Sequence, residues 1–436
     1  MSLPLLVIMV PVLLAMMGFA IDLGRLYLVR GELNQAANAM ALAAAQQLLG
    51  TAASLGNATT ASQQSLDDTV GDANKYYFGS LLIGQSSGIL NSTVNAPAFY
   101  ATIADAGAAS SGAATQADGT TARHVQITLN GDAPLIFWAL MPGGESRKAT
   151  IGAQALAGIS APLCTACGIE PFAVAAIDSS DTVNFGFGDP SALNVFTFAY
   201  SCTGNPAPIA LTGTTGTPAI VPYVILNRYD ASSASYNESQ QLYRDGAAGL
   251  LASTDPNPSG SVIPIGCVGI GDTTDTIWAS APPVSCALSA GPSVAAALCG
   301  LRSRFDSTDP TGACTTDVTD WAGLVTAFPP DSDVVTAITD PYAGYTGNGR
   351  RIVTLPIVAS LAPNVTGTMT ILGFRQFFLE VNADGSYINP GDPNGRFAAM
   401  YIGSPAPVKQ GWIDDRFGLA GGLLPTSGPG KVVLHQ

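Results

Sequence analysis

Cysteine is the residue type with the most chemical potential in this sequence, and two of the seven cysteines lie close together in Cys164-Thr-Ala-Cys167. This spacing occurs in half of a zinc site, in a redox pair and in a local disulfide. No second closely spaced pair completes a four-thiolate zinc site, and no helix evidently begins at Cys164 to activate a thiol. We therefore expect a structural disulfide, with zinc binding and redox chemistry as the alternatives.

All seven cysteines fall in one region, because none lies in the first 163 residues or the last 122. This grouping, behind an apolar N-terminal segment, favours a disulfide-bonded domain outside the cytoplasm. An odd number leaves at least one thiol free or paired between chains. We expect one of the close pair to join Cys202, and local loops to be closed by Cys267–Cys286 and Cys299–Cys314. The disulfide candidates are thus Cys164, Cys167, Cys202, Cys267, Cys286, Cys299 and Cys314.

A second group of possible ligands lies in the segment VNADGSYINPGDPNG, where Asn382, Asp384 and Asp392 are calcium candidates. The segment lacks the downstream glutamate of an EF-hand loop. Asp-Gly and Pro-Asn-Gly also form tight turns, so we expect a turn here and keep calcium as the alternative.

No pattern in the sequence indicates catalysis. There are two histidines, His124 and His435, and no nucleophile elbow, phosphate-binding glycine loop or His-Glu-x-x-His. We predict no enzymatic activity, no cofactor and no small-molecule substrate. The net charge of −14 and the absence of a basic patch argue against nucleic-acid binding.

The elements that must position these residues are short β runs after residue 160, rich in β-branched and aromatic residues and separated by turns. Short helices are expected at 294–302 and 318–328, and an earlier helix around 63–78. The expected strands cover 172–177, 183–188, 194–200, 222–230, 351–362, 368–382, 397–404 and 431–435.

The chain begins with an apolar segment of membrane length. Leu3 to Ile21 is 19 apolar or small residues, about 28 Å as a helix, which is close to the hydrocarbon thickness of a bilayer. A cleaved signal peptide is the alternative to a retained anchor, but the helical pattern continues through Asp22 without a turn signal. Arg25 and Arg30 would place the following residues in the cytoplasm by the positive-inside rule, whereas the cysteines favour the opposite side.

Beyond the apolar span the sequence continues as a stalk helix. Asp22 and Arg25 form an expected pair at the membrane edge, three residues apart. The apolar face of the stalk either packs on the protein's own globular part or packs against other subunits, and both remain open. The helix-packing positions are Leu26, Val29, Leu33, Ala37, Met40 and Ala44.

The stretch LPLLVIMVPVLLAMMGFAIDLGRLYLVRGELNQAANAMALAAA resembles the N-terminal segment of the Tad (tight adherence) family, the Flp pilus-assembly TadE/TadG-like proteins. The sequence departs from the family's pattern at Asn34, Asn38 and Met40, and the family's basic N-terminal flank is missing. The matching positions are Gly18, Ala20, Asp22, Gly24, Arg25, Tyr27, Leu33, Ala36, Ala39, Ala41, Leu42 and Ala43.

The stretch HVQITLNGDAPLIFWALMPGGESRKATIGAQALAGI is also similar to the family: a strand, then a proline and a short aromatic-containing helix over 134–141, then a second strand. In the first strand Val125, Ile127 and Leu129 alternate with polar residues, as in a half-buried strand. The resemblance implies a role in the tight-adherence pilus and secretion machinery, with an inner-membrane anchor and an extracytoplasmic body.

The sequence thus predicts an α+β protein with three parts: a transmembrane anchor and stalk helix (1–50), a connecting helix with a small α/β unit (51–160), and a β-rich, disulfide-stabilised extracytoplasmic domain (161–436). We expect a non-enzymatic, membrane-anchored component of the Tad/Flp machinery in pilus assembly or adhesion. Its expected partners are the membrane and other pilus components, or copies of itself through the N-terminal helix. The alternative is a subunit that itself polymerises into an extracellular filament; its fifth residue is Leu5 rather than the glutamate of type IV pilins.

Overall fold

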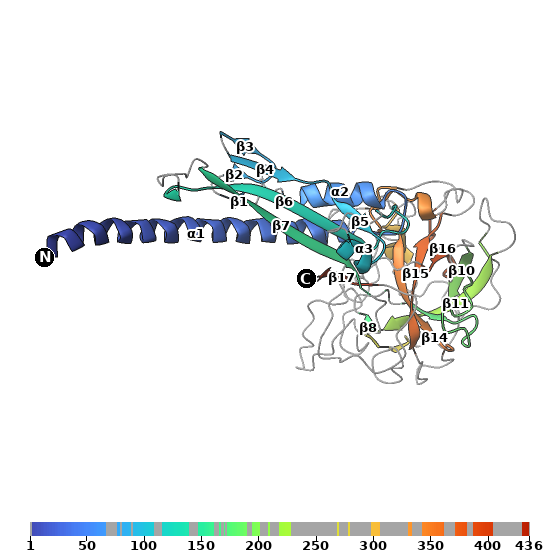
Figure 1. The fold of residues 1–436 in the computed structure, drawn as a ribbon. Helices are drawn as coiled ribbons and strands as arrows, with labels where there is room; N and C mark the ends of the chain where they lie inside the picture. Colours follow the sequence, from blue (N-terminus) through green and yellow to red (C-terminus); the bar gives the residue numbers. More distant parts are fainter. Residues whose placement is uncertain are drawn as a thin grey trace, which may run out of the picture. The chain divides into compact units, whose positions relative to one another are not determined.

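The chain forms two compact units, seen in the computed structural model in Figure 1. The N-terminal unit comprises Met1–Leu48, Ser54–Ile159 and Val432–Gln436, and the barrel unit comprises Leu49–Ala53 and Ser160–Lys431. The structure describes residues 2–66, 76–78, 81–88, 90–108, 116–138, 147–160, 165–166, 170, 172–189, 194–200, 208–209, 218–227, 268–269, 278–279, 298–305, 330–333, 342–361, 371–381, 387–403 and 430–435.

The N-terminal unit consists of one long helix packed on a sheet. Helix α1 (Ser2–Ala45) is continuous, and the shorter α2 (Ser54–Gln64) packs beside it. Of the helix expected around 63–78, residues 63–64 end α2, residues 77–78 form strand β1 instead, and residues 67–75 lie outside the described residues. The remaining elements are β1 (Tyr77–Phe78), β2 (Leu81–Leu82), β3 (Ser86–Ser87), β4 (Leu90–Val94), β5 (Ala98–Tyr100), α3 (Ile103–Ala108), β6 (His124–Pro134), β7 (Lys148–Ile159) and β17 (Val432–His435).

The sheet of this unit is ordered β17-β7-β6-β4-β3, and β5 also pairs with β6. The longest strands, β6 and β7, pair antiparallel from His124↔Gly158 to Pro134↔Lys148. Val125, Ile127 and Leu129 are fully buried between more exposed neighbours, which confirms the predicted half-buried strand. The C-terminal strand β17 pairs with β7, so the chain returns to this unit after the barrel unit.

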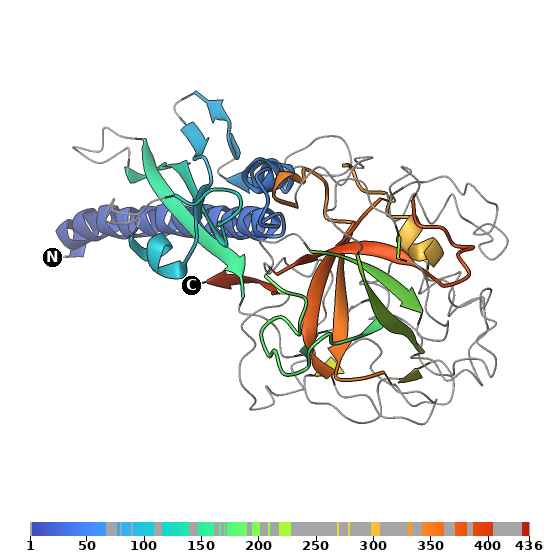
Figure 2. The same ribbon diagram turned by 90° about the vertical axis from the view of Figure 1, so that its right-hand side faces the viewer.

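The barrel unit is built on six strands that close on themselves, in the order β10-β16-β15-β14-β9-β11, because β11 also pairs with β10. Figure 2 shows these strands lying together in the barrel unit. In the core, Phe198 stacks on Phe397 (ring centroids 5.0 Å apart) and packs edge to face against Phe377 (5.1 Å). The strands are β9 (Phe172–Ala175), β10 (Val195–Tyr200), β11 (Ala219–Asn227), β14 (Ile352–Val358), β15 (Ile371–Leu379) and β16 (Phe397–Ile402), with β13 (Trp278–Ala279) on β11 and the separate pair β8 (Thr165–Ala166) and β12 (Val268–Gly269).

Most expected strands of this unit are present, but residues 183–188 form a turn instead. The Asp181 carboxylate accepts the backbone N–H groups of Val183, Asn184 and Gly186 at 3.0 Å. Phe185 and Gly186 adopt left-handed φ angles of 53° and 80°. Local side-chain capping therefore outweighs the strand pattern at these residues.

The segment after α1 belongs to the barrel unit. Tyr342, in the short helix η5 (Tyr342–Gly344), donates a hydrogen bond to the Leu49 carbonyl (2.7 Å), and the Ala52 N–H donates to the Ala343 carbonyl (2.6 Å). Residues 298–302 are helical, within the expected 294–302, and the expected helix at 318–328 lies outside the described residues.

Candidate functional site

Helix α1 has two halves with opposite environments. Large apolar side chains of the first half are exposed: Met9 (51%), Leu14 (61%) and Met17 (63%) are examples. This is the one helix in the described ranges that is long and apolar enough to cross a membrane, and only 17% of its apolar window is buried. A core helix of a soluble domain would bury that surface, so the exposed half has the character of a membrane span or signal.

The second half of α1 is covered by its own unit. The predicted helix-packing residues Val29, Leu33, Ala37, Met40 and Ala44 are at most 4% exposed, and Leu26 packs against the same cluster. Their neighbours include Val125 and Ile127 of β6 and Ala155 of β7. Alanine on the helix lets the sheet approach closely. For these positions the structure therefore favours packing on the protein's own globular part over packing against other subunits.

Asp22 lies near the middle of α1, and it is only 4% exposed. Its carboxylate accepts three backbone hydrogen bonds from the tip that joins β6 to β7: from Ile136 (2.9 Å), Phe137 (2.9 Å) and Trp138 (2.8 Å). A carboxylate that accepts several N–H groups is a strong cap for a tight turn. Arg25 lies near enough to interact electrostatically with Asp22, but the described hydrogen bonds of Asp22 go to the tip.

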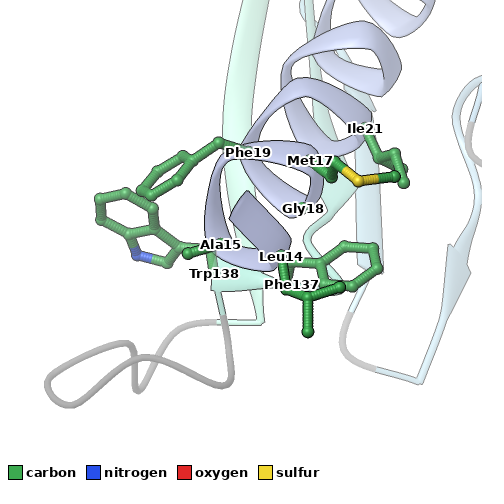
Figure 3. A pocket seen from close by; sticks show the side chains of 8 residues that line it. All are labelled: Leu14, Ala15, Met17, Gly18, Phe19, Ile21, Phe137 and Trp138. Atoms are coloured by element: carbon green, nitrogen blue, oxygen red, sulfur yellow. The ribbon is translucent and has the colours of Figure 1, made fainter. Parts of the chain in front are cut away.

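Close packing supports the same contact one turn earlier on α1. A Cβ atom at Gly18 would lie 2.6 Å from the Phe137 ring, so only glycine leaves room for that ring. Phe19 and Trp138 pack edge to face, with ring centroids 5.3 Å apart. Figure 3 shows the tip side chains on either side of Gly18, around an apolar hollow of about 430 Å³.

The base of the tip is held by a polar cluster around Asp132. Its carboxylate accepts hydrogen bonds from Lys148 (2.6 Å), Thr150 (2.6 Å) and the Asn91 N–H (3.1 Å). Burial opposes ionisation of Asp132, but these three donors outweigh it and hold the pKa of the carboxyl below its usual range. The helix expected over 134–141 does not begin at Pro134, which is the last residue of β6; residues 136–138 form a turn, and residues 139–141 lie outside the described residues.

The two histidines lie together at the far end of this sheet. The His124 and His435 rings are 5.3 Å apart, and His124 Nδ1 occupies the space where a Cβ atom of Gly158 would be, 2.1 Å away. Burial, His435 and Arg123 lower the pKa of His124 to about 4. His124 is therefore neutral in the folded protein at neutral pH.

We expect this unit to lose stability as the pH falls from about 6.5 to about 4. The unfolded chain binds a proton at His124 below about pH 6.5, whereas the folded chain does so only near pH 4, so protons favour unfolding in this window. The expected loss is on the order of 2 kcal/mol, measurable as a falling midpoint in thermal unfolding. His124→Gln should flatten the dependence; an unchanged slope would contradict it.

The other candidate residues that the structure describes form no common site. Asp392 pairs with Arg396 (2.7 Å) and accepts the Asn394 N–H, as expected of a turn, whereas Asn382 and Asp384 lie outside the described residues. Among the described residues no group of three His, Cys, Asp or Glu side chains could hold a metal ion. Cys299 is buried and disulfide-bonded; the other six cysteines lie outside the described residues.

Some of the buried charges in the described part of the barrel unit form ion pairs. Arg304 contacts Glu170, and Arg351 lies 3.6 Å from Glu380. Burial raises the pKa of Glu380 to about 7, and Arg351 opposes the shift. Ion pairs with this degree of burial are typical of structural networks.

The comparisons with known proteins bear on α1. Residues 1–47 match the family model Tad, described as "Putative Flp pilus-assembly TadE/G-like". No curated protein and no solved structure matches the chain. The matched segment covers the exposed span, Asp22 and the stalk, and so implies a Tad/Flp pilus-assembly component with an N-terminal membrane helix.

Proposed function

We propose that this protein is a membrane-anchored, non-enzymatic component of the Tad/Flp pilus machinery, acting in pilus assembly or adhesion. The proposal rests on the different environments of the two halves of α1. The first half exposes large apolar side chains, whereas the second half packs by one face in a folded unit. The family match covers both halves of the same helix. A helix of this kind tethers a folded head to a bilayer.

The head is proposed to lie outside the cytoplasm. The grouping of the cysteines supports this side of the membrane, and so does the disulfide at Cys299. No residue arrangement described above suggests a reaction, so the head is proposed to act through contacts with other pilus components.

A subunit that itself polymerises is the second candidate. The same bare half of α1 favours it, since apolar helix faces can be buried against each other in a fibre as well as in lipid. The apolar stalk positions Val29, Leu33 and Ala37 are covered by their own unit. Apolar packing between copies would therefore use the exposed apolar side chains of the first half of α1.

Complementation tests the proposed function. In cells that lack this protein, the full chain should restore surface pili, and a chain without residues 1–21 should not, because its head has no anchor. Pili are counted by electron microscopy, and immunogold labelling shows where the protein lies. Normal pili together with normal adherence in cells that lack the protein would contradict the proposal, and labelling along the length of the pili would favour the filament subunit.

A further inference from the structure

The tip between β6 and β7 exposes three consecutive large apolar side chains beside the membrane helix. Ile136 is 50% exposed, Phe137 37% and Trp138 44%. A hairpin tip in water is normally polar, because exposed apolar surface of this size is unfavourable. Packing inside the N-terminal unit thus leaves much of this apolar surface uncovered.

This apolar tip is continuous with the exposed surface of α1. Phe137 lies against Gly18, and Trp138 lies against Phe19, which is itself 41% exposed. The hollow between tip and helix is lined by apolar side chains from both (Figure 3). Whatever surrounds the first half of α1 therefore also reaches the tip.

The backbone N–H groups of residues 136–138 are all hydrogen-bonded within the protein, as an environment without water requires. Backbone N–H groups at residues 136–138 without a hydrogen-bond acceptor would be strongly unfavourable in hydrocarbon, because no water is there to replace it. Asp22 accepts all three. The same bonds satisfy the buried carboxylate, so helix and tip can enter an apolar environment together.

We propose that residues 136–138 are a second membrane-contacting element, which enters the interface of the bilayer beside α1 while a lipid acyl chain fills the hollow. Tryptophan at this position is typical of interfacial anchors. Two connected contacts would fix the rotation and depth of α1, with the membrane surface near Asp22. The inference rests on the proposed membrane anchoring and adds a site to it.

Tryptophan quenching by labelled lipids tests this. The full-length protein is reconstituted in phosphatidylcholine–phosphatidylglycerol vesicles that carry a nitroxide high on the acyl chain. Trp138→Phe removes the tip tryptophan, and Trp278→Phe, on β13 of the barrel unit, is the matched control. We expect most of the quenching by the labelled lipid to disappear in Trp138→Phe and to persist in Trp278→Phe. Iodide in the water should not quench the fluorescence of Trp138, which is the difference in emission between the wild-type protein and Trp138→Phe.

Vesicle flotation separates failure of this inference from failure of the anchor. If the protein floats with the vesicles but iodide quenches Trp138, the tip lies in water and the inference is wrong. If neither quencher reaches Trp138 until the protein is diluted in lipid, a second protein helix fills the hollow, which overturns the lipid assignment. If the protein does not float, the anchor itself is contradicted, and this inference with it.

Discussion

Replacing Asp22 with alanine is expected to release the tip from α1. The substitution leaves the N–H groups of Ile136, Phe137 and Trp138 without their acceptor. Hydrogen bonds to a charged group each contribute about 1.5–3 kcal/mol, and three that share one carboxylate should together contribute on the order of 3 kcal/mol. Hydrogen exchange of the three amides, measured on the detergent-solubilised protein, should therefore accelerate about 100-fold.

Asp118→Ala is the matched control for this substitution. Asp118 also caps a turn of the N-terminal unit, by accepting the N–H groups of Thr120 and Thr121 at 3.0 Å, but its turn lies at the exposed surface. Exchange at residues 136–138 should not change in this variant. If Asp22→Ala leaves the tip amides equally protected, the contact between Asp22 and the tip is not formed in solution.

Replacing Leu33 with alanine is expected to be the most destabilising single change on the stalk. Leu33 is fully buried in the cluster formed by α1, β6 and β7. Removing such a side chain costs about 2–5 kcal/mol, because the transfer energy is lost and a cavity remains. In a unit of this size the thermal midpoint should fall by about 10 °C.

Leu28→Ala makes the same chemical change on the same helix at a residue that is 72% exposed. It should shift the midpoint little, because surface substitutions are usually within about 0.5 kcal/mol. Scanning calorimetry of both variants in detergent gives the comparison. Equal shifts in the two variants would mean that the stalk does not pack on its own sheet.

The sequence shows which face of the stalk is apolar but not what covers it. The spacing of Leu33, Ala37 and Ala44 places them on one face of a helix. The same spacing is expected whether a sheet or another subunit covers that face. The covering strands β6 and β7 come about 80 residues or more later in the chain. Such long-range pairing has no local signal, so only the structure identifies the partner.

The same limit explains why the contact between α1 and the β6–β7 tip could be predicted only in part from the sequence. Asp22 and Arg25 are close in sequence, and their pairing is a local pattern. The partners that Asp22 binds are backbone N–H groups 114 to 116 residues further along, and such groups have no signature in the sequence. Gly18 matched a family pattern, but the reason for it, the Phe137 ring, appears only in three dimensions.

The strand expected at 431–435 shows a similar division. Its β-branched residues predict a strand correctly, but they do not show that it pairs with β7 in the N-terminal unit. The division predicted from the sequence, into 1–50, 51–160 and 161–436, did not place the C-terminal strand in the N-terminal unit. Local composition therefore predicts elements well and their sheet partners poorly.

The central claim is that a retained apolar helix carries a disulfide-stabilised head outside the cytoplasm. The most direct test is the intact mass of the protein from the membrane fraction, after free thiols are blocked with N-ethylmaleimide under denaturing conditions. We predict a mass that includes Leu3–Ile21 and far fewer adducts than the seven that fully reduced cysteines would give. A soluble protein that lacks those residues and carries seven adducts would contradict it.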